Sequence, residues 1–242
     1  MDERFSRSAR MLGEAAIEKL ARCHVAVFGI GGVGSFTAEA LARAGIGKLT
    51  LVDSDTISIT NINRQLHALS STVGQKKTEV MAARIKDINP NIELRLIDDF
   101  FLPENKDKFM ADYDYVVDAI DTVTGKIALV AECYARNIPI ISSMGAGNKL
   151  DPTLFRVADI YATSVDPLAK VMRKKLRALG VNKLKVVYST ERPISSKDDG
   201  EAPAPGRNTV PGSISFVPSA AGLILASVVV RDILQLKTQS AV

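Results

Sequence analysis

Short apolar runs alternate with amphipathic stretches along the first 147 residues of the chain. Five of the runs carry β-branched residues and predict strands, over 25–28, 48–52, 93–97, 114–120 and 138–142. Three stretches repeat apolar residues at helical spacing and predict helices, over about 32–44, 76–88 and 124–136. Because strands alternate with helices, we expect an α/β fold with a doubly wound, mostly parallel sheet and right-handed crossovers.

Both ends of the chain depart from this alternation. A helix over 8–20 precedes the first strand, where a doubly wound domain does not need one. Past Lys149, the pattern predicts a strand over 155–161, a helix over 166–179, a strand over 184–188 and a last apolar helix over 218–236. The segment of about 191–212 is rich in Pro, Gly, Ser and charge and predicts a mobile loop. We expect one domain over 1–242, with a core over 1–149 and an α+β elaboration over 150–242 that wraps onto the sheet.

The first predicted strand runs into the turn Gly29-Ile-Gly-Gly-Val-Gly-Ser35, which opens the first helix of the core. Gly29 lets the strand turn sharply, Gly31 lets a ligand approach the backbone and Gly34 lets the helix pack close to the sheet. The helix N-terminus offers N–H groups and a positive dipole end, which suit a phosphate. Asp53 follows the second strand, 19 residues past Gly34, where a carboxylate binds a ribose hydroxyl. This order predicts a mononucleotide or dinucleotide site; the alternative is a tight turn without a ligand.

Three features favour ATP over NAD as the nucleotide. The second strand is followed by side chains that suit a triphosphate, namely Asn61, Arg64, Gln65 and Lys77. Asp121 follows the fourth predicted strand, where an acid can hold Mg²⁺ against phosphate oxygens. The histidines are His24 and His67, and the sequence indicates no His–acid pair for hydride transfer.

Each of these residues also has a plainer explanation. Arg64 and Lys77 could be solvated surface charges. Asp121 could cap the helix that follows it, and Asp55 could be an ordinary turn residue. Their joint position around one crevice, rather than any single residue, favours the nucleotide site.

Composition narrows the class of protein further. Hydrophobic residues make up 46% of the chain and charged residues 24%, as in globular proteins with a sizeable core, and the net charge of +4 does not by itself indicate nucleic acid. The two cysteines, Cys23 and Cys133, exclude a cysteine-built zinc site and a disulfide framework, and they fit a reducing cytosol. The opening Met1-Asp-Glu-Arg4 predicts no signal peptide. The uncharged stretch 208–230 is interrupted by Pro and Gly, so we expect a buried helix in a cytoplasmic protein, with peripheral membrane association left open.

Five motifs follow one another in the core: Gly29-Ile-Gly-Gly-Val-Gly-Ser35, Leu51-Val-Asp-Ser-Asp55, Asn61-Ile-Asn-Arg-Gln65, Gly74-Gln-Lys-Lys77 and Asp118-Ala-Ile-Asp121. In order and spacing, over about 4–147, they resemble the adenylation domain that ubiquitin-activating enzymes share with the ThiF/MoeB/HesA group. The resemblance implies a Rossmann-like adenylation domain that works as a homodimer with ATP and Mg²⁺. In this family a substrate carboxylate attacks the α-phosphate and leaves an acyl adenylate and pyrophosphate.

The resemblance also implies roles for individual residues. Asp53 would bind the ribose, and Asp121 would hold Mg²⁺. Arg7 would match the arginine that reaches across the homodimer to the partner's ATP, which would explain the surplus first helix. The implied catalytic residues are Arg7, Arg64, Lys77 and Asp121. The implied ATP-binding residues are Gly29, Gly31, Gly32, Gly34, Ser35, Asp53, Asp55, Asn61, Arg64, Gln65 and Lys77.

The C-terminal third separates this chain from the sulfur-carrier activators of the family. Those carry two Cys-x-x-Cys pairs for zinc, which this sequence lacks, and Cys133 falls inside an apolar helix, so thiol chemistry is not indicated. The stretches 143–149, 151–153, 157–160, 163–168 and 211–218 instead resemble the tRNA threonylcarbamoyladenosine dehydratase branch.

This second resemblance implies the reaction. ATP would activate the threonine carboxylate of the modified tRNA adenosine, and the ureido group would close on the activated carbon and expel AMP, giving a cyclic hydantoin or oxazolone. One alternative is an adenylating activator of a ubiquitin-like sulfur-carrier protein. Another, from a different class, is an NAD-dependent oxidoreductase or a nucleotide-sensing module.

A run of basic residues in the C-terminal third bears on the partner. Lys174, Lys175 and Arg177 lie in one predicted helix and could neutralise tRNA phosphates; the alternative is a solvated helix face. Aromatic residues are only 5% of the chain, so base stacking is not indicated. We expect tRNA carrying threonylcarbamoyladenosine and a second copy of the chain as partners, and no DNA; a partner protein from a sulfurtransferase system stays open.

Overall fold

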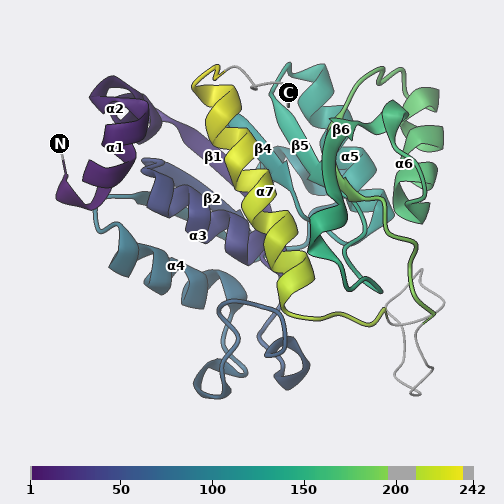
Figure 1. The fold of residues 1–242 in the computed structure, drawn as a ribbon, viewed down its shortest axis with the longest axis horizontal. Helices are drawn as coiled ribbons and strands as arrows, with labels where there is room; N and C mark the ends of the chain where they lie inside the picture. Colours follow the sequence, from purple (N-terminus) through teal and green to yellow (C-terminus); the bar gives the residue numbers. More distant parts are fainter. Residues whose placement is uncertain (1, 196–210, 237–242) are drawn as a thin grey trace.

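A seven-stranded sheet forms the centre of the molecule (Figure 1). The computed structural model describes residues 2–195 and 211–236. The strands are β1 (His24–Phe28), β2 (Lys48–Val52), β3 (Glu93–Ile97), β4 (Tyr115–Asp118), β5 (Ile140–Ser143), β6 (Phe155–Asp159) and β7 (Lys185–Ser189). Their order in the sheet is β3-β2-β1-β4-β5-β7-β6, and all neighbours are parallel except β6 and β7. The expected doubly wound α/β fold is therefore confirmed.

Helices cover both faces of this sheet. They are α1 (Ser6–Leu12), α2 (Glu14–Arg22), α3 (Gly34–Ala44), α4 (Lys77–Ile88), α5 (Val123–Ala135), α6 (Pro167–Ala178) and α7 (Phe216–Ile233). Apolar residues of α3, α4 and α7 share one buried core with alternate residues of the strands. Those of α5 and α6 line two smaller cores on the opposite face. Figure 1 shows the first set of helices in front of the sheet.

The C-terminal third extends the sheet and covers it. β7 and β6 continue the sheet beyond β5, while α7 crosses its front face. At the contact with α3, Thr37 donates a 3.0 Å hydrogen bond to the Gly222 carbonyl, and a Cβ on Gly222 would lie 2.3 Å from the Val33 carbonyl oxygen. By length and composition α7 could cross a membrane, but here it packs tightly on α3 as the expected buried helix.

Two expectations from the sequence are corrected. The helix expected over 8–20 is two helices, because Gly13 breaks it with φ of +86°. The strand expected over 114–120 ends at Asp118, so Asp121 lies three residues beyond the strand rather than at its end. Of the loop expected over 191–212, residues 196–210 lie outside the described part of the chain.

Strand register brings the carboxyl ends of four strands to one edge. Phe28 of β1 is paired with Val52 of β2 and Asp118 of β4, and Asp118 is paired with Ser142 of β5. The segments that follow these residues therefore start at the same level, on either side of the point where the strand order reverses. Doubly wound sheets bind their ligands in the crevice at this point.

Candidate functional site

The glycine turn sits at this crevice, and its glycines have different surroundings. Gly29 has φ of +85°, and a Cβ there would lie 2.6 Å from the Ala119 carbonyl oxygen. A Cβ on Gly34 would lie 1.8 Å from the Gly29 carbonyl oxygen, so only glycine lets α3 start this close to the strand. A Cβ on Gly31 would meet nothing nearer than Gln65 Nε2, at 3.8 Å. Gly29 and Gly34 thus shape the turn, while Gly31 leaves the backbone approachable.

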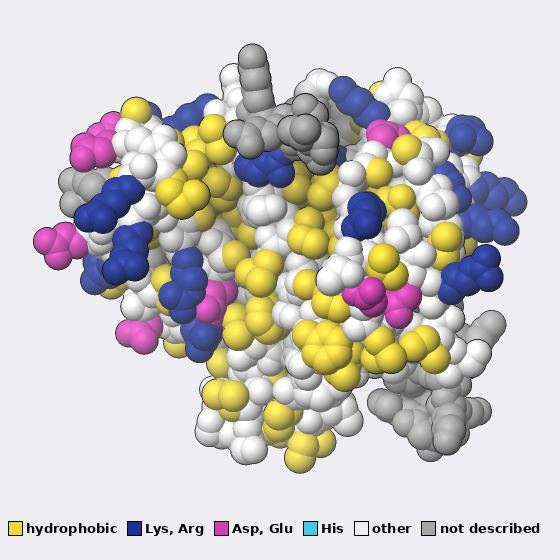
Figure 2. Space-filling view, viewed as in Figure 1, with side chains coloured by type: hydrophobic (Ala, Val, Ile, Leu, Met, Phe, Trp, Pro, Cys, Tyr) yellow, Lys and Arg dark blue, Asp and Glu magenta, His cyan; other side chains and the backbone are white. Residues whose placement is uncertain are grey.

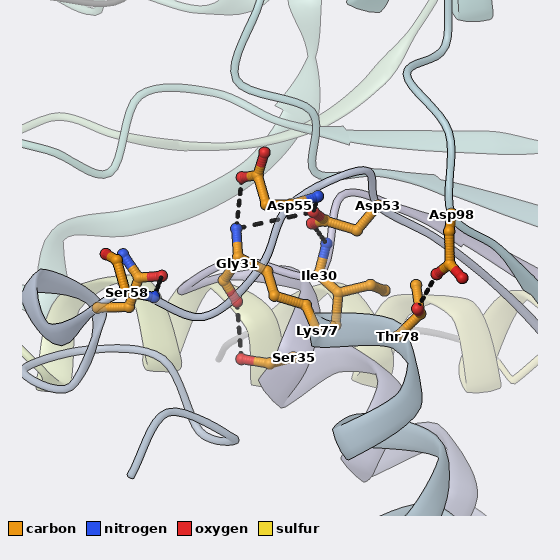
Figure 3. Close-up of polar contacts among 10 residues, drawn as sticks. Ile30, Gly31, Ser35, Asp53, Asp55, Ser58, Lys77, Thr78 and Asp98 are labelled. Carbon is orange, nitrogen blue, oxygen red and sulfur yellow. Dashed lines mark hydrogen bonds and ion pairs between the residues drawn. The ribbon is translucent and has the colours of Figure 1, made fainter. Parts of the chain in front are cut away.

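Asp53, Asp55 and Lys77 meet beside this turn (Figure 3). Asp53 accepts the N–H of Ile30 on Oδ2 at 2.6 Å and the N–H of Asp55 on Oδ1 at 3.0 Å. Lys77 Nζ donates to Asp55 Oδ2 at 2.6 Å and lies 3.7 Å from Asp53 Oδ1. The lysine is buried and Asp55 is exposed, so the cation is held at the wall of the crevice with its carboxylate partner facing solvent.

Burial dominates the electrostatics of this corner. It raises the pKa of Asp53, although Lys77 and the two backbone N–H donors oppose the shift. A carboxylate that is hard to ionise in place gains from further hydrogen bonds to its charged form, such as a ligand hydroxyl supplies. Asp53 is therefore suited to bind a polar group that enters the crevice.

The loop after β2 carries the remaining candidates, and several hold the loop itself together. Asn61 Oδ1 accepts the N–H of Ser58 at 3.2 Å. Arg64 Nη1 donates to the Thr60 carbonyl and to Asn63 Oδ1, both at 2.9 Å. The hydroxyl of Ser35 donates to the Gly31 carbonyl at 2.7 Å and accepts the N–H of Leu66 at 3.3 Å. Ser35 thus ties the glycine turn to this loop.

Asp121 follows β4 and so lies across the β1–β4 switch point from Asp53. It is exposed, between the end of β4 and the start of α5. Thr122, one residue on, occupies the N-cap position of α5 but makes no side-chain capping bond. In the described part of the chain no three His, Cys, Asp or Glu side chains gather as a metal site. A metal ion at Asp121 would need further oxygen ligands from a substrate or water.

Arg7 is not brought into this crevice. It belongs to α1, and the preceding Phe5 packs on Gly45, at the C-terminal end of α3. The glycine turn lies at the other end of that 11-residue helix, about 16 Å away along its axis. Arg7 therefore lies toward the amino-terminal edge of the sheet.

The basic residues of α6 lie on a separate face. Figure 2 shows Lys and Arg side chains gathered at the right-hand edge, where Figure 1 places α6. Lys174 and Arg177 line a shallow depression of about 420 Å³ together with Lys170 and Arg173, and Lys175 is not part of its lining. Arg177 also stacks over the Tyr161 ring at 5.1 Å. All three predicted residues are exposed, and two of them line this depression.

The structure also reveals residues that sequence reasoning assigned no role. His67 is buried beside Lys77, and burial first and then that charge lower its pKa to about 4. On the β4 side, Lys126 forms a buried ion pair with Asp118. A lone lysine inside the apolar stretch 123–135 was the signal that could have found this pair.

Comparison with known proteins agrees with this geometry. The family model of the ThiF family matches residues 5–241. The chain is 50% identical over 245 aligned positions to the tRNA threonylcarbamoyladenosine dehydratase of Bacillus subtilis, covering 97% of this chain and 96% of that protein. It is also similar to crystal structures of the Escherichia coli tRNA N6-threonylcarbamoyladenosine dehydratase, TcdA, in complex with AMP (TM-score 0.87) and with ATP (TM-score 0.86), each 40% identical and covering 96% of this chain and 94% of the other.

The fold and the crevice define a Rossmann-like nucleotide-binding protein of the adenylation type. More narrowly, the chain belongs to the ThiF family. The match continues through the C-terminal third, where the sequence departs from the sulfur-carrier activators.

Proposed function

We propose that this chain is an ATP-dependent tRNA dehydratase that cyclises threonylcarbamoyladenosine by adenylating its threonine carboxylate. The similarity to the Bacillus subtilis dehydratase carries the proposal, because it extends over 97% of the chain and so includes the parts outside the nucleotide crevice. Crystal structures of the Escherichia coli relative hold ATP, the substrate of such an adenylation, and AMP, which leaves when the ring closes.

In this proposal the crevice binds ATP from both walls. Asp53 accepts a ribose hydroxyl, and the backbone of 29–34 with the start of α3 faces the phosphates. Lys77, Arg64 and Asn61 neutralise and orient the triphosphate. Asp121 would hold Mg²⁺, an ion that proteins usually bind through one or two carboxylates. The metal would supply charge neutralisation on the phosphates.

The proposed reaction needs no protein nucleophile. A carboxylate oxygen of the threonine attacks the α-phosphorus, the bond to the β-phosphate oxygen breaks, and pyrophosphate leaves. The ureido group then attacks the activated carboxyl carbon, AMP leaves, and a proton is lost, so one water is removed overall. Because ring closure is intramolecular, correct positioning supplies much of the rate.

The state of the cysteines supports this reaction over thioester transfer to a sulfur-carrier protein. Both are buried free thiols. Burial raises the pKa of the Cys133 thiol to about 12, so the thiolate is scarce at neutral pH. A protein that activates a carrier should catalyse pyrophosphate exchange only when a carrier ending in Gly-Gly is supplied.

A homodimer is part of the proposal. α1 buries none of its residues within the chain, and its Met11 is 87% exposed. Exposed apolar residues also lie on the loop after β2, including Ile59, Leu69 and Val73. Arg7 lies far from the crevice of its own chain, so it would act on the ATP of a partner subunit. We also propose that the protein is cytoplasmic and that it binds tRNA through α6. A sulfurtransferase-type protein is a further proposed partner.

Mass spectrometry of tRNA nucleosides tests the function directly. tRNA that carries threonylcarbamoyladenosine is incubated with the protein, ATP and Mg²⁺, and the nucleosides are then analysed. We expect the modified nucleoside to lose one water, with AMP and pyrophosphate formed in equal amounts. An unchanged nucleoside under conditions where the protein binds ATP would overturn the proposal.

A further inference from the structure

A buried polar cluster lies directly behind the segment that carries Asp121. It consists of Asp118 at the end of β4, Lys126 near the start of α5 and Ser142 of β5. Lys126 Nζ donates to Asp118 Oδ2 at 3.0 Å and to Ser142 Oγ at 3.2 Å. The Ser142 hydroxyl donates to the same carboxylate oxygen. The side chains of Asp118 and Lys126 are 0% and 1% exposed, so no ligand reaches them.

The second oxygen of Asp118 shapes the chain that leads to Asp121. Oδ1 accepts the N–H of Ile120 at 3.1 Å. Between these residues, the Ala119 N–H donates to the Phe28 carbonyl at 2.8 Å, and the Ala119 carbonyl lies against Gly29. At the far end, the Lys126 N–H donates to the Thr122 carbonyl at 3.0 Å. Asp118 thus fixes the start of the 119–122 segment, and the first turn of α5, which carries Lys126, fixes its end.

Stability alone does not require a charge pair at this place. Taking two charges out of water is costly, and well-packed apolar residues of similar size often hold a fold equally well. The charged pair instead orients the carboxylate of Asp118, because each of its oxygens forms hydrogen bonds with different partners. Oδ2 fixes the carboxylate to α5 and β5, and Oδ1 then fixes the turn of 118–120.

We propose that Asp118 and Lys126 are positioning residues that hold the 119–122 segment so that Asp121 can bind Mg²⁺ together with ATP. The inference rests on the role of Asp121 in the proposed function. Neither residue touches substrate, and both act through the backbone of this segment.

The test compares two ways of making the cluster neutral. The double variant D118V/K126M is apolar and removes the bond to the Ile120 N–H, whereas D118N/K126M keeps an oxygen for that bond. ATP affinity is measured with and without Mg²⁺, and melting temperatures are recorded. The ion pair between Lys106 and Glu132 provides the control K106M/E132Q, because Glu132 lies on the same helix, nearly two turns beyond Lys126 and further from Asp121.

Wild type should bind ATP more tightly with Mg²⁺ than without it. In D118V/K126M this enhancement should fall by about tenfold, the effect of removing one charge-assisted hydrogen bond, while the affinity without Mg²⁺ stays within about threefold of wild type. D118N/K126M keeps the bond to the Ile120 N–H but lacks the lysine that orients the side chain at 118, so its enhancement should fall by only about threefold, and the control should keep the enhancement. An enhancement in D118V/K126M equal to that of wild type overturns the inference.

Three further measurements test the inference if the main variant does not fold or if Asp121 does not bind Mg²⁺. If D118V/K126M does not fold, S142A is measured instead: it removes the two hydrogen bonds of the Ser142 hydroxyl, to Asp118 and Lys126, and should lower the enhancement by about threefold while the protein stays folded. An enhancement equal to wild type then overturns the inference. A D121N variant that keeps the enhancement, or a wild type without any, overturns the metal assignment and this inference with it. Dehydration of tRNA by wild type, measured separately, decides whether the proposed activity stands.

Discussion

On each side of the crevice, an aspartate at the end of a strand lies close to a lysine at the start of the next helix. The two acid–lysine pairs differ in how deeply they are buried. On the β2 side, Asp53 follows the strand and lies 3.7 Å from Lys77, the first residue of α4. On the β4 side, Asp118 ends the strand and pairs at 3.0 Å with Lys126, near the start of α5. Asp118 is sealed in the interior with both oxygens bonded within the chain. Lys77 instead shares its charge with the exposed Asp55.

How deeply each ion pair is buried decides whether it can bind a ligand. A sealed ion pair is fully satisfied by the protein and can only orient its neighbours. The pair of Asp53 and Lys77 can exchange an internal partner for a ligand, because Asp55, the second partner of the lysine, is exposed to solvent. The same strand–acid–lysine unit therefore supports the backbone on one wall and is available for binding on the other.

The largest effect is expected at Asp121, the residue that the sealed pair supports. Asp121→Ala should lower the rate of dehydration by about 10²- to 10³-fold, the typical cost of removing one group that stabilises developing charge. Asp121 is exposed, so the melting temperature should stay within a few degrees of wild type. AMP release and nucleoside mass spectrometry measure the rate. Asp112→Ala is the control, since Asp112 is exposed and precedes β4; a fully active Asp121→Ala would contradict the assignment.

The second prediction concerns His67, whose buried ring stays neutral beside the Lys77 cation. Its pKa in the folded protein is about 4, below the ordinary 6.5, so the unfolded chain binds the proton more readily. Stability that is fully present above pH 6.5 is therefore lost as the pH falls toward 4. The loss amounts to about 3 kcal/mol at most.

The variant that removes this titration is His67→Leu. Its free energy of unfolding should depend less on pH between 6.5 and 4 than that of wild type. It should be at least as stable at pH 7, because neither ring nitrogen of His67 has a hydrogen-bond partner among residues 2–195 and 211–236. Denaturant titrations at several pH values measure the difference. Parallel pH curves for the two proteins would show that His67 titrates normally.

A variant of Lys77 tests whether the β2 side of the crevice binds ATP. Lys77→Met should weaken ATP binding by about ten- to a hundredfold, as expected when a charge-assisted hydrogen bond to a phosphate is removed. Lys76→Met is a close control, because Lys76 is adjacent in sequence but half exposed and paired with Asp98. Calorimetric titration with ATP measures both affinities. Equal affinities for the two variants would mean that Lys77 serves only Asp55 and Asp53.

The sequence predicts one of these walls far better than the other. β2 and β3 have the expected bounds, and Lys77 is found because a local motif carries it. Asp121 is misplaced by a few positions because Asp118 turns its side chain back to the Ile120 N–H and ends the strand early. The apolar pattern of the strand does not signal that turn; the one signal for the buried carboxylate is the lysine eight residues further on, inside the apolar helix.

The N-terminal helix shows the same limit at smaller scale. Apolar spacing over 8–20 suggests a continuous helix, yet Gly13 takes a φ of +86° and the chain changes direction there. A single glycine is tolerated inside a helix at modest cost, so the sequence alone does not show whether it breaks one. Contacts that join distant segments, such as Phe5 on Gly45, decide the outcome.

The smallest effects are expected on the basic face of α6, where single lysine and arginine side chains would contact tRNA phosphates. Arg173, Lys174 and Arg177 all line the open depression, but Arg173 also donates to the Thr163 carbonyl at 3.0 Å. We expect K174A/K175A/R177A to bind tRNA more weakly and to reduce the slope of log affinity against log salt by about 2, or roughly one for each phosphate that is no longer neutralised. Lys175→Ala alone should have the smallest effect, because Lys175 does not line the depression.

Filter binding over a range of salt concentrations measures both quantities. The control variant R10A/K19A/R22A removes the same charge from exposed positions on α1 and α2, and it should change the slope little. A general effect of net charge would lower the affinity of both triple variants equally, whereas a specific surface affects only the first. Equal slopes for both variants and wild type would place the tRNA elsewhere on the molecule.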